Sequence, residues 1–453
     1  MFLLVFINGV KMNARKIIIS SFLFLLIYFG EIALSFSDKS SGEKVIPTTD
    51  NIPLSYKLTN NLSAYESMQG FDSDIIEFMK TWKIVGASVA VIKDEKLIYS
   101  KGFGYADKEN KIETEPKHLF RIASVSKLIT AVAIMKLVEE GKISLSDTVF
   151  GERGILNQPE YLNIKDKRIK DITVKNLLNH SAGWSSRRPD PMFKNIEIAR
   201  AMNKDLPLNS ETIIEYVLRK RNLDFSPGKK SSYSNLGYAI LGKIIEKKSG
   251  ISYEKYVITE ILNPIGIYDM HLGKTEFDHL LKNEVRYYGL PGEKKVQSTI
   301  DNKRKVAKYY GGNSLETLGA AGAWVASATE LAMLLVYIDG YFKQNDILTP
   351  ESVIEMTHVK RGMKPIGWSG TDGKGNWWRS GTLSGTSALL KRQNNGISWV
   401  FIMNTTPKYG AKFTYRINKA MTDGLKKIDN WPTFNLFDYY ESDLFQDNLF
   451  TQK

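Results

Sequence analysis

The chain of 453 residues contains no cysteine. This absence excludes disulfides, thiol catalysis, cysteine-ligated zinc and a lipidated N-terminal cysteine. There are only 5 histidines, which are scattered and form no HExxH pair, so a metal site is not indicated. The chain also lacks a lysine- and arginine-rich block of the nucleic-acid-binding type, although its formal net charge is +13. A basic surface favours anionic partners in general, but a nucleic-acid binder would rest on total charge alone.

What the chain does contain is a large apolar inventory. The hydrophobic fraction is 43%, with 21 Phe, 22 Tyr and 8 Trp. That is enough for a sizeable core in one large domain or two ordinary ones.

The N-terminal segment resembles a secretory signal. After Met12 come the basic residues of "NARK" and then an apolar run over Ile17–Gly30. The run is shorter than the roughly 20 apolar residues that a membrane-spanning helix needs. Small residues at Ala33 and Ser35 suit cleavage, so we expect residues 1–35 to be removed and the protein to be periplasmic or extracellular. The alternative is an uncleaved segment that anchors the protein to the membrane.

The rest of the chain divides by composition. We expect a polar tether over 36–68, a folded domain over 69–428 with a helical insertion at about 120–320, and a C-terminal tail over 429–453. Strands are predicted near both ends of the domain, at Gly86–Asp107 with a turn at Asp94-Glu95, and again in the segments "WWRSGTLSGTSALLKRQ" and "GISWVFIMNTT". The economical fold is α/β (α+β): one sheet built from N- and C-terminal segments, flanked by helices.

One helix carries an unusual pair at its start. "RIASVSKLITAVAIMKLVEEG" (Arg121–Gly141) is strongly apolar, yet Ser124 and Lys127 lie one turn apart at its mouth. A serine hydroxyl needs a base to become a good nucleophile, and lysine is a base only when burial or a positive field lowers its pKa. The positive end of the helix dipole provides such a field. The same spacing recurs at Ser252 and Lys255, so the pair alone is weak evidence.

A second element strengthens the interpretation. Tyr233-Ser234-Asn235 lies in a polar stretch directly before another predicted helix. A tyrosine beside a positive charge can relay a proton, and the Asn235 amide can contact a substrate carbonyl or hold the lysine.

These elements together resemble the serine β-lactamases and penicillin-binding peptidases, most of all the class C β-lactamases, D-Ala-D-Ala carboxypeptidases of that type and their esterase relatives. The resemblance covers about residues 70–428. The segments "FRIASVSK", "LLNHSAGW", "FSPGKKSSYSNLGYAILG", "ILNPIGIYDMHLG" and "GAAGAWVASATELAMLL" occur in that family's order. The resemblance implies a β-lactamase/transpeptidase-like fold with an antiparallel, mixed sheet beside a helical subdomain.

The resemblance also implies roles. Ser124 is the expected acyl nucleophile, Lys127 its base partner, and Tyr233 the proton relay, while Asn235 contacts the substrate amide. The backbone N–H groups of Ser124 and Thr382 are expected to form the oxyanion hole.

The third motif of the family departs from its usual form. Where Lys or His, then Thr or Ser, then Gly is expected, this chain has Arg379-Ser380-Gly381. Arginine keeps the charge and can bind a substrate carboxylate with two hydrogen bonds, but it cannot shuttle protons. The alternative is that Arg379 is a solvated strand residue. For His180, in the "LLNHSAGW" loop, we expect a structural role.

The sequence therefore predicts an exported serine hydrolase that forms an acyl-enzyme on Ser124. Its substrate is a small molecule or peptide, namely a β-lactam, a D-amino acid peptide or a simple ester. No metal, organic cofactor or nucleic-acid partner is implied, and no oligomeric state is indicated. The alternative is a catalytically weak or inactive binding protein of the same fold that recognises peptides or cell-wall fragments.

Overall fold

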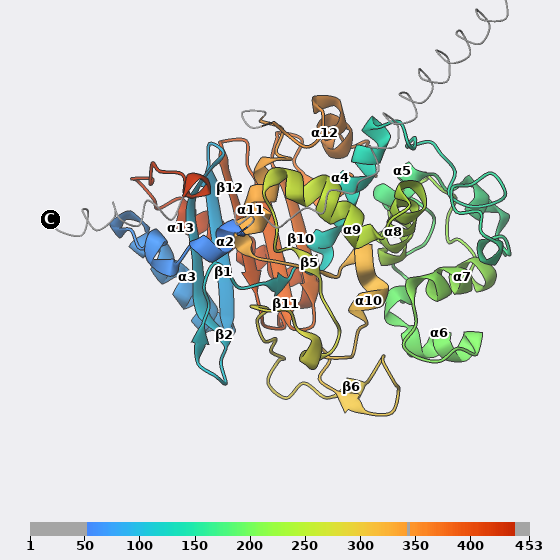
Figure 1. The fold of residues 1–453 in the computed structure, drawn as a ribbon, viewed down its shortest axis with the longest axis horizontal. Coiled ribbons are helices and arrows are strands. Elements are labelled where there is room, and N and C mark those ends of the chain that lie inside the picture. The colour runs from blue at the N-terminus through green and yellow to red at the C-terminus, as the bar shows by residue number, and fades with distance from the viewer. Residues whose placement is uncertain (1–51, 342–344, 440–453) are drawn as a thin grey trace, which may run out of the picture. The chain divides into compact units, whose positions relative to one another are not determined.

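The centre of the fold is a seven-stranded sheet with the strand order β3-β2-β1-β12-β11-β10-β9 (Figure 1). It is seen in a computed structural model that describes residues 52–341 and 345–439. Every pair of neighbouring strands in this sheet is antiparallel. The strands are β1 (Gly86–Lys93), β2 (Lys96–Asp107), β3 (Ile112–Glu113), β9 (Gly370–Thr371), β10 (Trp377–Leu383), β11 (Thr386–Arg392) and β12 (Ile397–Met403).

The hairpin of β1 and β2 forms where the sequence predicts it. Asp94 and Glu95 connect the strands and both have positive φ, at 51° and 65°. Two such residues give the tight turn whose twist matches that of the flanking strands. The predicted turn is therefore confirmed.

Strand β1 pairs on its other side with β12, which comes from the far end of the domain. The register places Val89 opposite Phe401, and the Gly86 N–H donates to Asn404 Oδ1 at 2.8 Å across 318 residues of chain. The predicted single sheet, built from N- and C-terminal segments, is thus confirmed.

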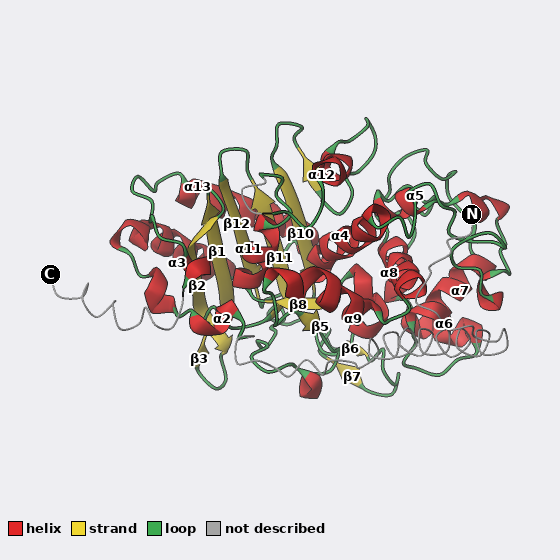
Figure 2. Ribbon diagram, turned by 45° about the horizontal axis from the view of Figure 1, so that its top comes forward, coloured by secondary structure: helices red, strands yellow, loops and turns green. Residues whose placement is uncertain are grey.

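Helices cover both faces of the sheet (Figure 2). Val89 and Val91 of β1 pack in one core with helices α3 (Gln69–Trp82) and α13 (Thr414–Leu425), whereas Ala90 and Ile92 pack in the other core with α4 (Ser126–Glu139) and α11 (Ala328–Val336). Successive side chains of a strand point to opposite faces, so an unbroken apolar run such as β1 is buried on both.

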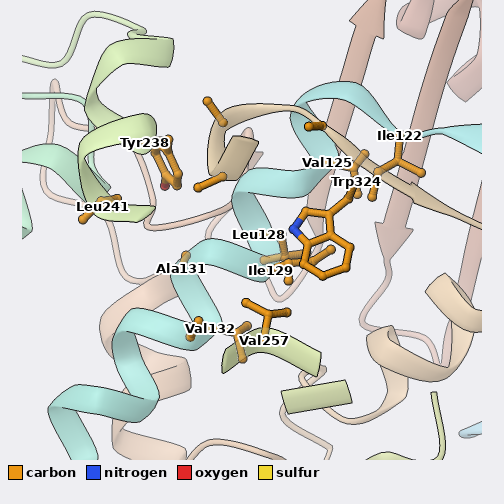
Figure 3. Close-up of a cluster of buried hydrophobic side chains, with 14 of the residues drawn as sticks. Ile122, Val125, Leu128, Ile129, Ala131, Val132, Tyr238, Leu241, Val257 and Trp324 are labelled. Atoms are coloured by element: carbon orange, nitrogen blue, oxygen red, sulfur yellow. The ribbon is translucent and has the colours of Figure 1, made fainter. Parts of the chain in front are cut away.

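Helix α4 is apolar on nearly all sides and lies inside the molecule between the sheet and the helical part. Figure 3 shows its residues Leu128, Ile129, Ala131 and Val132 among buried side chains that include Trp324. A helix that is hydrophobic all round is buried, and this burial holds the N-terminal end of α4 beside β10.

The remaining helices and strands complete the fold. The helices are α2 (Leu54–Lys57), α5 (Val174–Leu178), α6 (Asn195–Met202), α7 (Ser210–Lys220), α8 (Asn235–Ser249), α9 (Tyr253–Val257), α10 (Leu315–Leu318) and α12 (Pro350–Thr357). The short strands are β4 (Phe120–Arg121), β5 (His271–Leu272) and β8 (Trp324–Ala326), which form a second sheet, and β6 (Val296–Gln297) and β7 (Lys305–Val306), which form a third.

Two predicted boundaries need correction where the structure describes them. Residues 52–68, predicted as part of the tether, pack on the domain, because Leu58 and Met68 are buried in its cores. Residues 429–439, predicted as tail, also contribute: Leu436 is buried, and Asn435 Oδ1 accepts a hydrogen bond from the Leu97 N–H at 3.0 Å. The predicted signal segment, the start of the tether and the end of the tail lie outside the described residues.

Candidate active site

The predicted nucleophile lies in a tight turn and not in the helix itself. Strand β4 ends at Arg121, a 3₁₀-helix spans Ala123–Val125, and α4 begins at Ser126. Ala123 has a φ of +48°, a conformation that residues with a Cβ rarely adopt. The sequence predicted one continuous helix from Arg121. In the structure α4 begins only at Ser126, so Ser124 lies just before the N-terminal end of this helix.

Three side chains meet at the N-terminal end of α4. Ser124 Oγ lies 2.5 Å from Tyr233 Oη and 3.2 Å from Lys127 Nζ. Tyr233 precedes α8 by two residues, so the start of α8 faces the start of α4. The side chain of Lys127 is completely buried, whereas Tyr233 is 40% exposed. The serine therefore has two candidate proton acceptors within hydrogen-bonding distance.

Lys127 is held by two further oxygen atoms. Its Nζ donates to Asn235 Oδ1 at 2.7 Å and to the backbone oxygen of Ala321. An ammonium group has three donors, and Ser124, Asn235 and Ala321 supply three acceptors. Lys127 is thereby fixed in place beneath Ser124, and Asn235 holds the lysine.

The orientation of Asn235 is itself fixed by Asp190, which sequence reasoning missed. The backbone N–H and the Nδ2 of Asn235 both donate to Asp190 Oδ2, at 2.9 and 3.1 Å. The amide oxygen is therefore free to accept from Lys127. Asp190 also caps the 3₁₀-helix Pro191–Phe193. Its place in "SRRPDPMF" has the form of an ordinary helix cap, which gave no sign of this role.

The electrostatics of the site make Lys127 easier to deprotonate than a lysine in water. Burial lowers the pKa of Lys127 from its ordinary value of 10.5; the interaction with Tyr233 opposes this, and the charge of Arg379 adds to it. For Tyr233, burial raises the pKa, but the charges of Lys127 and Arg379 outweigh it, so the pKa falls below 10.0. The pKa values of both side chains are thus lower than their ordinary values.

Strand β10 forms the opposite wall. A Cβ on Gly381 would lie 2.1 Å from the Ile122 carbonyl oxygen and 2.8 Å from the Ser124 nitrogen, so only glycine lets the strand approach the turn this closely. Its neighbour Ser380 is held by Ser369, whose Oγ accepts from the Ser380 N–H at 3.1 Å. Thr382 follows on the same strand and lines the same cavity as Ser124.

Arg379 is not a solvated strand residue, so that alternative is wrong. Its side chain is 1% exposed, and its Nε donates to the backbone oxygen of Ser124 at 2.6 Å. Nη2 is buried and has no hydrogen-bond partner among the described residues.

The cavity between the Ser124 turn, the start of α8 and strand β10 has a volume of about 410 Å³. Of the eight predicted site residues, seven line it and Lys127 lies directly beneath. The seven are Ser124, Tyr233, Asn235, Arg379, Ser380, Gly381 and Thr382. Sequence reasoning missed several other lining residues, which come from distant parts of the chain: Phe193, Leu318, Lys364 and Trp368.

His180 also lines the cavity, as part of the loop after α5. Its ring lies 4.6 Å from that of Tyr233, and its Nδ1 accepts from the Ser234 N–H at 3.3 Å. Burial, together with the charges of Arg379 and Lys127, holds its pKa well below 6.5, so the ring is neutral. These contacts position Tyr233, in keeping with a structural role.

The described residues, 52–341 and 345–439, contain neither a metal-binding cluster nor a membrane-spanning helix. Within these ranges there is no group of three or more His, Asp or Glu side chains that could hold a metal ion. Nor does any helix in them have the length and apolar character needed to cross a membrane.

Comparisons with known proteins agree with this geometry. The family model described as Beta-lactamase matches residues 71–420, and the chain belongs to that family. Protein flp of Staphylococcus aureus (strain NCTC 8325 / PS 47) is 26% identical over 384 residues, which cover 81% of this chain and 68% of that protein.

Two solved structures show the same β-lactamase/transpeptidase-like fold. The octameric penicillin-binding protein homologue from Pyrococcus abyssi superposes with a TM-score of 0.58 at 28% identity, covering 78% of this chain and 77% of that one. The D-amino acid amidase from Ochrobactrum anthropi SV3, in complex with L-phenylalanine amide, superposes with a TM-score of 0.62 at 22% identity, covering 81% and 99%.

Proposed function

We propose that this protein is a serine hydrolase that forms an acyl-enzyme on Ser124 and acts on an amide or ester. The observation that carries the proposal is the contact of Ser124 Oγ with both Tyr233 Oη, at 2.5 Å, and Lys127 Nζ, at 3.2 Å, at the edge of a cavity. A buried lysine with a lowered pKa is the base that an unactivated serine requires.

The reaction has two steps. In acylation, Ser124 Oγ bonds to the substrate carbonyl carbon, its proton passes to the Tyr233–Lys127 pair, and the leaving nitrogen or oxygen takes that proton as its bond to carbon breaks. In hydrolysis, water adds to the acyl carbon and Ser124 Oγ leaves with a proton. The N–H groups of Ser124 and Thr382 would stabilise the oxyanion, a contribution typically worth a factor of about 10²–10³ in rate.

The substrate classes that we propose are a β-lactam, a D-amino acid peptide or amide, and a simple ester. The fold shared with a D-amino acid amidase supports the second of these. The test is intact-mass detection of a covalent adduct after incubation with a penicillin, a fluorophosphonate and a D-alanyl ester, with the Ser124→Ala protein as control. An adduct that is absent from Ser124→Ala supports the proposal. Equal labelling of both proteins, or labelling of neither by any of the three probes, contradicts it.

One observation favours a second candidate, a binding protein of the same fold with little or no turnover. Arg379 occupies the position at which Lys or His is expected in this family, and its guanidinium cannot release a proton. Such a protein would bind peptides or cell-wall fragments in the same cavity. Saturable binding of a D-alanyl peptide without any turnover of ester, amide or β-lactam would favour it over the hydrolase.

We also propose that the protein is exported, on the basis of the Met12–Ser35 signal pattern, which lies outside the described residues. N-terminal sequencing of the native protein should find a start near Phe36. Recovery of Met12 would instead mean that the segment is retained as an anchor.

A further inference from the structure

A second cavity, with a volume of about 690 Å³, adjoins the candidate active site. It lies between α5 and the segment that follows α12; both helices are labelled in Figure 1. We call it the basic groove and define it by its charged side chains, which are Lys175, Lys229, Glu355, Lys360, Arg361 and Lys364.

The positive charge of the basic groove is not neutralised within the described residues. Lys229, Lys360, Arg361 and Lys364 are exposed, and none of them forms an ion pair with a described carboxylate. The single carboxylate in the lining, Glu355, is already paired with Lys175 at 2.5 Å. Four cations without a described carboxylate partner therefore surround one cavity, and together they concentrate a positive potential there.

A third cavity, which shares Tyr233 and Asn235 with the candidate active site, differs from the basic groove in its balance of charges. It has a volume of about 330 Å³ and is also lined by arginines, but it contains Asp190 and Asp224 as well. Arg188 Nε lies 2.9 Å from Asp224 Oδ1. Basic residues can thus be balanced by carboxylates in the same cavity, and the basic groove differs in having four cations without a described carboxylate partner.

The basic groove is connected to the candidate active site through one loop. Lys364 lines both cavities. The Lys364 N–H donates to Ser231 Oγ at 2.9 Å, and Ser231 Oγ donates to the Asn179 carbonyl at 2.6 Å. Ser231 is two residues before Tyr233, so the backbone of Lys364 is tied to the segment that carries the predicted proton relay.

We propose that the basic groove binds an anionic segment of the substrate, a chain that carries several phosphate or carboxylate groups beyond the bond that is cleaved. Exposed lysine and arginine side chains suit this role, because lysine binds oxyanions as a point charge and arginine through its planar fork. The inference rests on the proposed function in one respect, namely that the bound chain belongs to the substrate of Ser124. It specifies the substrate as larger than the cavity at Ser124 and anionic over its remote part.

The test measures direct binding of anionic chains to the Ser124→Ala protein, so it does not depend on turnover. Fluorescently labelled inorganic polyphosphate and poly-glutamate are titrated at low and high salt, and anisotropy is recorded. In this Ser124→Ala protein, the additional substitutions Lys360→Ala and Arg361→Ala remove two of the unpaired charges. The matched control, Lys294→Ala with Lys295→Ala, removes the same charge from another exposed loop.

We expect roughly tenfold weaker binding after the groove substitutions and little change after the control substitutions, since each exposed ionic contact contributes modestly and is screened by salt. Stronger binding of polyphosphate would identify a phosphate-bearing chain, and stronger binding of poly-glutamate a polycarboxylate. Bound chain should also protect Lys229, Lys360 and Lys364 from acetylation, mapped by mass spectrometry, while Lys294 and Lys295 stay reactive.

Equal losses in the groove and control proteins would overturn the proposal, because binding would then follow total charge. Binding of neither chain would overturn it as well. The outcome is separable from that of the proposed function: an adduct on Ser124 without chain binding removes the groove inference alone, whereas chain binding without any adduct removes the hydrolase and, with it, the assignment of the bound chain to a substrate of Ser124.

Discussion

The guanidinium of Arg379 lies against the backbone of Ser124: Nε donates a 2.6 Å hydrogen bond to the Ser124 carbonyl oxygen, across 255 residues of chain. The bond joins β10 to the strained turn that presents the serine. Since the guanidinium is almost completely buried, its charge acts at short range on Lys127 and Tyr233. Arg379 therefore contacts the Ser124 turn in a way that its place in the motif did not predict, and the carboxylate-binding role that the sequence suggested stays a prediction.

The two roles of Arg379 predict different losses. Arg379→Ala should lower kcat/KM for a neutral ester because the Ser124 turn loses a charge-assisted bond, which typically costs about 1.5–3 kcal/mol, or ten- to a hundredfold. A matched substrate that bears a carboxylate should lose more, and Arg379→Lys should recover part of both losses. Equal losses on the acid and the ester would contradict carboxylate binding, and an unchanged ester rate would contradict the positioning role.

The charge of Arg379 also predicts a shift in the pH profile. The proposed mechanism requires a neutral Lys127, so kcat/KM should rise as pH increases through the pKa of Lys127. Arg379 contributes to lowering that pKa, so Arg379→Gln should raise it and move the rising limb to higher pH. The measurement is kcat/KM for a neutral ester against pH in both proteins. A limb that stays in place, or that moves to lower pH, would mean that this charge does not act on the base.

Lys127 itself should be essential for acylation. Lys127→Arg retains a positive charge but cannot supply a neutral base, so we expect adduct formation to fall by at least about 10²-fold. The chain offers a matched control in Lys255, which follows Ser252 at the same spacing but is exposed. Lys255→Arg should acylate normally. Circular dichroism checks the fold of both proteins, and near-normal acylation by folded Lys127→Arg would remove Lys127 from the mechanism.

Asp190 should act through Asn235. Asp190→Ala removes the acceptor of both Asn235 donors, so the amide can turn away from Lys127, and we expect activity to fall about tenfold. It also removes a helix cap, which typically costs about 1 kcal/mol of stability. Asp166→Ala removes a comparable cap, that of the 3₁₀-helix Lys167–Asp171, without a contact to the site.

Stability and activity together separate these effects. Both aspartate substitutions should lower the melting temperature, but only Asp190→Ala should lower kcat/KM, and Asp190→Asn should restore part of it. If Asp166→Ala reduced activity as much, the effect of Asp190 would be one of stability alone.

Gly381 should tolerate no side chain. An added Cβ would meet the Ile122 carbonyl at 2.1 Å, so Gly381→Ala must push β10 away from the Ser124 turn. We expect acylation to fall by at least about 10²-fold, since small displacements of reacting groups are costly. Gly70→Ala is the control, because its added Cβ meets nothing within 4 Å. The measurement is the rate of adduct formation; a normal rate in Gly381→Ala would mean that this close approach is not required.

Local patterns were sufficient for much of the fold. The alternation over β1 and β2, the turn at Asp94-Glu95 and the apolar run of β12 each predict their element from neighbouring residues alone. The motif residues were also predictable, because each lies in a short stretch with a distinctive chemical pattern.

What could not be predicted depends on long-range contacts. Strand β8 has three residues and β4 two, too few to show a periodicity, yet they pair to support the Ser124 turn. Asp190 and Lys364 are ordinary charged residues in loops, and only the folded chain brings Asp190 to Asn235 and Lys364 to the cavity at Ser124. The packing of residues 52–68 was missed because its apolar residues, such as Leu58, are interspersed with Ser, Thr and Asn and form no long helix or strand.

The pairing of β1 with β12 has a consequence for the order in which the protein can fold. Strand β1 lies near the start of the described chain, but its neighbour in the middle of the sheet is among the last segments to be made. The hairpin of β1 and β2 can form early, since its contacts are local, whereas closing the sheet must wait until nearly the whole chain is available. Ser124 and Lys127 are then synthesised long before the wall that faces them, β10. An unfinished chain therefore lacks an assembled candidate active site, which forms only when the two ends of the domain come together.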